Sequence, residues 1–379
     1  MNSYKEIFNY LAPIHIADTF EKEYAKEQVG NVISIVTEDN CDIDEIDVIF
    51  IGCGEFRNQI KSASYSHGPD KIREAFYDLF YWHDQIKIGD IGNIIEGNTA
   101  QDTYSALRTV ITELEALGKK VVVLGGSHDI SLQQYLVFKE KQEIVDMTVF
   151  DMLADINPGE GFRFDNHLVD VLTTTPNFIR NFSLIGFQSY YVNPSIVETL
   201  HRFGFDCIRV GKAREDLDQI EPSVRSSSIC SIDINSIRQS DAPANRLASP
   251  NGFYGDEACR ITRYAGLSNS MKMLGIYGYR PELDKEDLTA KLIAQMLWYY
   301  IDGLQLLVSE AELDDEEAFL EYNISFTDQQ LFFKKSKQTN RWWMRMPDDR
   351  FIACSYADYL KACNNQMPER WLRELERIA

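Results

Sequence analysis

The segment KVVVLGGSHD, residues 120–129, joins a short apolar run to a turn of two glycines and three polar residues. Continuous apolar runs of this kind are typical of strands that are buried on both faces of a parallel sheet. Gly125 and Gly126 allow a sharp turn, which delivers His128 beyond the carboxyl end of the strand. Ligands bind at such strand ends in open α/β sheets, so the turn is a candidate functional site.

Similar apolar runs recur along the chain, and helical periodicity fills the gaps between them. The clearest helix is predicted over residues 103–120, where Gly118 and two lysines mark its end. Buried strands that alternate with helices predict a three-layer, doubly wound α/β fold with a mostly parallel sheet. The other predicted strands cover residues 48–54, 147–152, 182–188, 205–210, 228–234 and 272–279.

Three segments are expected from the pattern along the chain. Residues 1–45 predict an N-terminal helical segment with an acidic end, and residues 46–325 predict the α/β domain. Residues 326–379 predict a short C-terminal extension, in which Lys and Arg outnumber Asp and Glu. Two interpretations of the extension stay open: a module that packs on the core or on a neighbouring subunit, and an ordinary hairpin plus helix with a solvated basic face.

The charge of the chain excludes two classes of partner. The 379 residues carry 38 Lys and Arg against 59 Asp and Glu, a net charge of −21. Nucleic acids and anionic membranes usually require a basic face, so we expect neither as a partner. The N-terminal residues lack the pattern of a signal peptide, and no apolar stretch is long enough for a membrane span. Seven scattered cysteines without a C-x-x-C pair predict reduced thiols and a cytoplasmic location.

Acidic and histidine side chains follow three of the predicted strands, in the segments GGSHD (125–129), DMLAD (151–155) and SIDIN (231–235). One imidazole and three carboxylates that converge from neighbouring strands would suit an oxygen-preferring divalent ion such as manganese. Each element alone has an ordinary explanation as a turn residue or a helix N-cap. Their shared location at strand ends predicts a metal site made of His128, Asp151, Asp155 and Asp233.

These three segments resemble the motifs of the arginase/agmatinase/formimidoylglutamase (ureohydrolase) family. Members of that family carry G-G-D-H-S, D-A-H-x-D and S-x-D-x-D-x-x-D-P-x-x-x-P in this order. The chain reads GGSHD, DMLAD and SIDINSIRQSDAP, and SHGPDKIREAF (66–76) is similar to the family's G-P-x-x-x-R helix. The resemblance covers roughly residues 45–305, and it implies an arginase-like fold and a homo-oligomer.

The resemblance implies a complete ligand set for one metal and an incomplete set for the other. The family's first metal is held by one His and three Asp, and their matches are His128, Asp151, Asp155 and Asp233. The second metal also needs a His and an Asp where this chain has Leu153 and Asn235. Leucine cannot bind a metal, and a neutral amide is a poor ligand for a hard cation. We therefore expect at most one divalent ion per chain, with manganese favoured, or none.

Four further positions bear on activity. Gly278 stands where the family places a Glu that pairs with the guanidinium group, so this anchor is lost. His167 lies close to the position of the arginases' proton-shuttling His, which makes it the candidate catalytic residue, although a helix-start histidine is the plain alternative. Ser127 and Asp129 exchange the family's Asp and Ser, and Asp129 is a candidate to rotate inward and replace a lost ligand.

Three functions remain open on this basis. The first, which we favour, is a family member with a degenerate dinuclear site and weak or no amidine hydrolysis. The second is an active metal-dependent hydrolase of C–N bonds in linear amidines, with a formimidoylglutamate-like or guanidino substrate. The third is a non-catalytic protein that binds a small molecule or acts as a scaffold. The family reaction uses a hydroxide that bridges two ions, and the loss of one ion removes that bridge.

Overall fold

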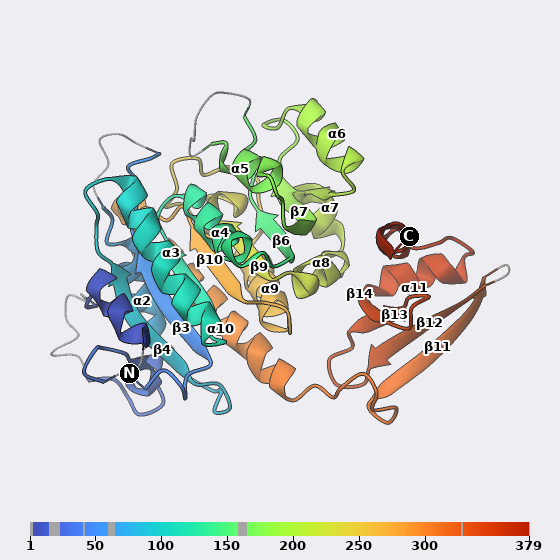
Figure 1. Cartoon of the computed structure of the whole chain (residues 1–379), viewed down its shortest axis with the longest axis horizontal. Coiled ribbons are helices and arrows are strands. Elements are labelled where there is room, and N and C mark those ends of the chain that lie inside the picture. The colour runs from blue at the N-terminus through green and yellow to red at the C-terminus, as the bar shows by residue number, and fades with distance from the viewer. Residues whose placement is uncertain are drawn as a thin grey trace.

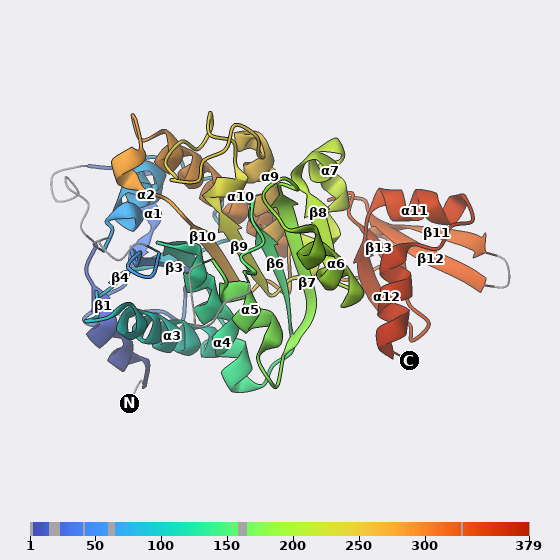
Figure 2. The same cartoon turned by 90° about the horizontal axis from the view of Figure 1, so that it is seen from above.

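The computed structural model describes residues 3–14, 23–40, 42–59, 65–157, 165–326 and 329–378. A ten-stranded, mostly parallel sheet forms the centre of the molecule, and a separate four-stranded antiparallel sheet lies near the C-terminus (Figure 1). Helices cover both faces of the large sheet, which confirms the predicted three-layer α/β architecture (Figure 2).

The strands of the large sheet follow the order β1-β4-β3-β5-β10-β9-β6-β7-β8, with β2 paired to β4. Every pair is parallel except β1 with β4. The strands are β1 (Leu11–Ala12), β2 (Ser34–Ile35), β3 (Val48–Cys53), β4 (Ile88–Ile94), β5 (Lys120–Gly125), β6 (Val145–Phe150), β7 (Ile179–Phe187), β8 (Asp206–Arg209), β9 (Ile229–Asp233) and β10 (Met273–Tyr277). All seven predicted strands are present, and the four that carry the candidate site, β5, β10, β9 and β6, are neighbours at the centre.

Alternate residues of each central strand face opposite helix layers. In β3, Val48 and Phe50 belong to one core cluster, whereas Ile49 and Ile51 belong to the other. The first layer contains α1 (Val29–Val32), α2 (Gly68–Tyr77), α7 (Val210–Glu215), α8 (Glu221–Ser226), α9 (Gly255–Gly266) and α10 (Leu288–Val308). The second contains η1 (Ser3–Tyr10), α3 (Ala100–Ala116), α4 (Ser131–Lys141), α5 (His167–Thr173) and α6 (Pro194–Arg202). Short 3-10 helices lie between these elements: η2 (His128–Ile130), η3 (Leu217–Gln219), η4 (Ile234–Ser236) and η5 (Pro281–Leu283).

The N-terminal segment differs from the helical prediction for residues 1–45. It contains the strands β1 and β2, which both pair with β4 and so extend the large sheet. These strands are only two residues long each. They form because β4 offers free backbone groups, and a two-residue strand has no periodicity that a sequence pattern could reveal.

The C-terminal module consists of the antiparallel sheet and two helices. Its elements are β11 (Phe319–Phe326), β12 (Gln329–Ser336), β13 (Trp342–Arg345), β14 (Phe351–Cys354), α11 (Tyr356–Cys363) and α12 (Glu369–Ile378). Trp342 and Met344 on one face of the sheet pack with Trp371 of α12 in a small core of their own. The module begins at Phe319 rather than at residue 326, because the acidic run before and within β11 masks the alternation of FLEYNISF.

The module packs against the α/β core through buried arginines. Arg341 forms an ion pair of 2.7 Å with Glu310, and its Nη1 donates to the carbonyl oxygen of Leu267. From the core, Arg225 Nη2 donates to the carbonyl oxygen of Trp342 at 2.8 Å. The extension is therefore a module that contacts the core rather than a solvated hairpin.

Two other features of the described residues complete the fold. The described cysteines, which exclude Cys41, are all free thiols. Over the same ranges, no helix combines the length and the apolar character that crossing a membrane requires.

Arg73 of α2 anchors that helix to the sheet. Its side chain is 1% exposed, and its Nε and Nη2 form a fork on the carboxylate of Asp90 in β4, at 2.7 and 2.9 Å. Its Nη1 donates to Asp70 at 3.0 Å, and Tyr77 also donates to Asp90. Buried charges of this kind depend on every partner, because removal of one leaves the others without compensation.

We therefore expect Arg73→Met to lower the free energy of unfolding by about 3–5 kcal/mol, because Asp90 and Asp70 stay buried without their cation. Arg260→Met is the control: this arginine pairs with Asp218 at the surface, with 48% of its side chain exposed. Its removal should cost about 1 kcal/mol or less. Urea denaturation of both variants measures the difference, and equal losses would contradict the role given to Arg73.

Candidate metal centre

The turn after β5 places His128 through two close packing contacts. A Cβ at Gly125 would lie 2.1 Å from the ring of Tyr277, and one at Gly126 would lie 2.1 Å from the carbonyl oxygen of Glu55. Only glycine fits at both positions, so the chain can turn directly off the strand. His128 then opens the short turn η2 and precedes α4, with 5% of its surface exposed.

The four predicted ligands converge on one buried point. His128 Nδ1 lies 2.6 Å from Asp151 Oδ2, 3.3 Å from Asp155 Oδ2 and 3.9 Å from Asp233 Oδ2. Asp151 and Asp155 follow β6, and Asp233 is the last residue of β9. Ligand atoms lie within 4.8 Å of one another in two groups that share His128: one with Asp151 and Asp233, the other with Asp155 and His167. The donor set of one imidazole and three carboxylates fits a single hard divalent ion.

The electrostatics of this cluster favour a cation. Burial alone would lower the pKa of His128, but its hydrogen bonds to Asp151 and Asp155 prevail and raise the pKa well above the usual value. Burial, with the charge of Asp151 next, raises the pKa of Asp155 well above its usual range and that of Asp233 to about 7. Without an ion, the cluster therefore holds protons where a divalent cation would compensate the carboxylates.

The two positions of the second metal make structural hydrogen bonds instead. The backbone N–H of Leu153 donates to Asp151 Oδ1 at 2.7 Å, and its side chain offers no ligand atom. The side-chain oxygen of Asn235 accepts the backbone N–H of Met152 at 3.0 Å, and the backbone N–H of Asn235 donates to Asp233 Oδ1 at 2.8 Å. Both residues thus orient the ligands of the first site and join the loops after β6 and β9.

Gly278 lies against Asp233, one of the candidate ligands. Its φ is +83°, and an added Cβ would lie 2.4 Å from Asp233 Oδ1 and 2.6 Å from Asn245 Nδ2. Asn245 Nδ2 donates both to Asp233 Oδ1 at 3.1 Å and to the carbonyl oxygen of Gly278 at 3.0 Å. The absence of a side chain at Gly278 therefore makes room for the contact that fixes Asp233.

Two residues that orient the ligands were missed by the sequence prediction. Ser231 Oγ lies 2.8 Å from His128 Nε2, so it fixes the imidazole with Nδ1 directed at the carboxylates. The sequence could have indicated this role, because Ser231 precedes Asp233 by two residues and therefore lies on the same face of β9. Asn245 carried no such signal, since it reaches Asp233 from a loop between η4 and α9.

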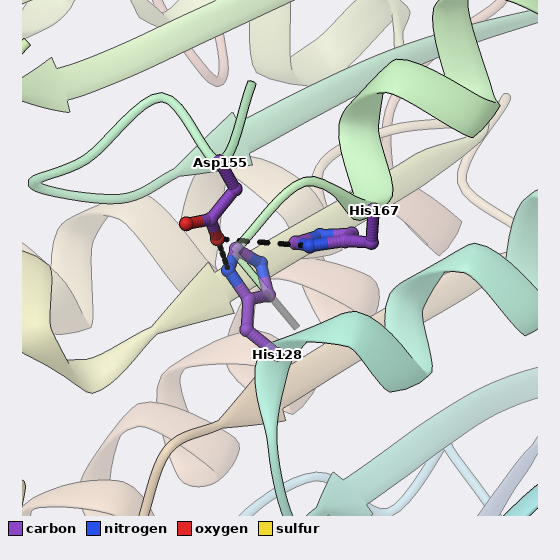
Figure 3. A group of neighbouring side chains, drawn as sticks. All are labelled: His128, Asp155 and His167. Carbon is purple, nitrogen blue, oxygen red and sulfur yellow. Dashed lines mark ion pairs between the residues drawn. The ribbon is translucent and has the colours of Figure 1, made fainter. Parts of the chain in front are cut away.

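His167 joins the cluster from the start of α5. Its Nδ1 is 3.7 Å from Asp155 Oδ2, and its ring centroid is 4.9 Å from that of His128 (Figure 3). The side chain is fully buried, and it forms a possible ligand group with His128 and Asp155. The structure thus brings the predicted catalytic candidate beside the predicted metal ligands.

Asp129 does not turn toward the metal ligands. Its Oδ2 accepts hydrogen bonds from Tyr104 at 2.6 Å and from Asn58 at 2.7 Å, and its Oδ1 accepts one from Ser127. The hypothesis that Asp129 replaces a lost ligand is wrong, because these three donors hold the carboxylate elsewhere. The exchange of Asp and Ser in this turn therefore gives a hydrogen bond between Ser127 and Asp129 that Asn58 and Tyr104 extend.

Known proteins are similar to this chain over most of its α/β core. The family model described as "Arginase family" matches residues 46–302. A formimidoylglutamase from Bacillus subtilis (strain 168) is 24% identical over 270 residues, which cover 67% of this chain and 81% of that protein.

Solved structures share the fold at lower identity. The formimidoylglutamase structure from Bacillus subtilis has a TM-score of 0.67 and 17% identity, and covers 76% of this chain and 95% of its own. A Trypanosoma cruzi formiminoglutamase with Mn2+2 has a TM-score of 0.64 and 15% identity, over 73% of this chain and 98% of its own.

We expect Ser231→Ala to weaken manganese binding about 10–100-fold, because the imidazole of His128 loses the partner that orients it. Ser131→Ala is the matched control: Ser131 is equally buried, and its Oγ has no hydrogen-bond partner within the described ranges. Each variant is freed of metal with a chelator that is then removed, and isothermal titration calorimetry with manganese measures its affinity. Equal affinities for the two variants would show that Ser231 does not orient the ligand.

In the metal-free protein, the free energy of unfolding should fall as the pH rises from about 4 to about 7. Burial raises the folded pKa of Asp233 to about 7, so the native state keeps a proton that the unfolded state releases in this window. The contribution is complete below the unfolded pKa and is lost as the pH rises through the folded one.

Urea denaturation in the presence of a chelator, repeated across this pH range, measures the slope. Asp233→Asn should reduce it, because the amide does not titrate. Manganese should also reduce it, because the ion takes the place of the proton. An unchanged slope in the variant would assign the effect to other groups.

Proposed function

The chain belongs to the arginase family, and from this premise we propose that it binds a single manganese-type ion and has weak or no activity toward amidines. The observation that carries the proposal is the asymmetry of the site. His128, Asp151 and Asp233 form a buried ligand group, and Asp155 lies beside them. At the two positions that a second ion requires, Leu153 has no side-chain ligand atom, and the side-chain oxygen of Asn235 accepts a backbone N–H.

The ligands available to each ion support one ion rather than two. The cluster holds three carboxylates, Asp151, Asp155 and Asp233, and a neutral or protonated His128. With a neutral His128, one divalent ion leaves a net charge of −1, whereas a second ion would bring two more positive charges to a place where Leu153 and Asn235 supply no anionic ligand. Uncompensated charge of either sign is costly in such surroundings.

The same charges limit the chemistry. A bound divalent ion supplies Lewis acidity and a more acidic water. Three carboxylates on one ion neutralise much of its charge, so its effect on a water is reduced. Gly278 provides no side chain to pair with a guanidinium or amidinium group, and a Cβ there would meet Asp233. Recognition and activation of an amidine are thus both weakened.

His167 favours a second candidate, an active C–N hydrolase of linear amidines that uses one ion. The formimidoylglutamases among the relatives suggest this substrate class. The imidazole of His167 lies 3.7 Å from Asp155 and packs against His128, so it is placed to hold or transfer a proton beside the ion.

Metal content and turnover test the proposal together. The full chain, treated with a chelator and then supplied with manganese, should bind one ion per chain by elemental analysis. Asp155→Asn should weaken binding by about tenfold or more. Asp129→Asn should not, because Asp129 is an equally buried carboxylate of the neighbouring turn that lies outside the ligand group.

Formimidoylglutamate, arginine and agmatine should give no manganese-dependent release of formamide, ammonia or urea. Two fully occupied ions per chain would overturn the proposal. Turnover that is lost in both Asp151→Ala and His167→Ala would establish the active hydrolase instead.

A further inference from the structure

A cavity lies at the junction between the α/β core and the C-terminal module. Its volume is about 410 Å³. On the core side it is lined by the residues that open β6 and β7, and on the other side by β13, β14 and α12. It therefore borders the amino ends of the strands, whereas the metal centre follows the carboxyl ends. Strands of this length separate the two sites by roughly 20 Å.

Arginines dominate the lining of this cavity. It contains no lysine and six arginines: Arg180, Arg225, Arg341, Arg350, Arg370 and Arg373. A chain with a net charge of −21 would not gather six cations at one place by composition alone. Each guanidinium presents five N–H donors in a planar fork that matches the oxygens of a carboxylate or phosphate.

The two innermost arginines hold the junction together. Arg225 and Arg341 are 6% and 7% exposed, and their guanidinium groups lie 4.4 and 5.3 Å from the ring centroid of Trp343. Arg225 pairs with Glu221 at 2.6 Å, and Arg341 pairs with Glu310 at 2.7 Å. Their charges are thus compensated by the protein, and they form the floor of the cavity.

The arginines nearer the solvent retain unused donors. Arg180 of β7 binds Asp146 through Nε and Nη2, and its Nη1 has no partner among the described residues. The side chain of Arg350 donates only through Nε, to Asp348, which leaves both Nη groups without a protein acceptor in the same ranges. Arg373 of α12 pairs through its two Nη groups with Asp206 and Glu369. Its Nε has no acceptor within the described chain.

Five acidic residues also line the cavity, and three of them, Asp146, Asp206 and Glu310, are held by protein donors; the other two are Glu312 and Glu374. Asp146 is buried beneath the fork of Arg180, and Asp206 is paired with Arg373. Glu310 accepts hydrogen bonds from Arg341, Ser336 and Thr339. A cationic ligand would therefore compete with existing ion pairs, whereas an oxyanion would meet free N–H donors.

We propose that the junction cavity binds a small oxyanion, a phosphate- or carboxylate-bearing molecule that bridges the core and the module. Arg180 from the core and Arg350 and Arg373 from the module supply the donors. The module lies outside the residues that match the arginase family, so the site is a feature of this chain and is independent of the metal centre. A ligand that bridges the two parts stabilises the junction because it binds only when both are in place.

Titration of the full-length protein with inorganic phosphate, and separately with succinate, tests the proposal. We expect at least one of the two to bind, with saturation below millimolar concentrations, and to raise the melting temperature. Arg350→Ala/Arg373→Ala should weaken that binding by about tenfold or more, because two cations that flank the ligand are lost. Phosphate alone would identify a phosphoryl ligand, and succinate alone a carboxylate one; either outcome supports the proposal.

The matched control is Arg260→Ala/Arg263→Ala. These two arginines of α9 form surface ion pairs with Asp218 and Asp302, and neither lines the cavity. The control should bind as tightly as the parent protein. Binding of neither anion, or equal binding by the parent and the Arg350/Arg373 variant, would overturn the proposal. Unchanged circular dichroism of both variants shows that a loss of binding is not a loss of fold.

Discussion

The contact between the imidazole of His128 and three carboxylates is the constraint on which the centre of the molecule depends. Asp151, Asp155 and Asp233 come from the ends of two strands that pair with each other, and His128 comes from the end of β5. Parallel pairing brings these ends to one edge of the sheet, where their mutual repulsion must be compensated. The glycines at 125, 126 and 278 and the amide of Asn245 all serve to bring the four groups together.

The sequence predicted the parts of the fold that rest on local pattern. Continuous apolar runs gave seven strands of the large sheet, because a strand buried on both faces must be apolar throughout. It missed β4, whose sequence IGDIGNI is interrupted by two glycines and by Asp90. That aspartate is tolerated in a buried strand because Arg73 reaches it from α2. A long-range ion pair of this kind leaves no mark on the local pattern of either segment.

The candidate site also contains residues whose position could be predicted and residues whose position could not. The proximity of the four candidate ligands could be predicted, because each belongs to a motif at a strand end. The orientation of Asp129 could not be predicted, because Asn58 and Tyr104 donate hydrogen bonds to it from distant parts of the chain. Residue type alone left open whether that carboxylate faced the ligands or the interior. Only the packing of the loop after β3 and of α3 against the turn decides the matter.

The departures from the dinuclear motif are linked to one another, so no single substitution would restore it. An aspartate at position 235 could still accept the N–H of Met152, but it would face a leucine where the other ligand is required. A side chain at 278 would displace Asp233 or Asn245, since its Cβ alone would meet both of them. Leu153, Asn235 and Asn245 thus hold Asp151 and Asp233 by direct or loop-joining hydrogen bonds. On the proposal of a single ion, that ion and the loss of the anchor follow from one packing arrangement.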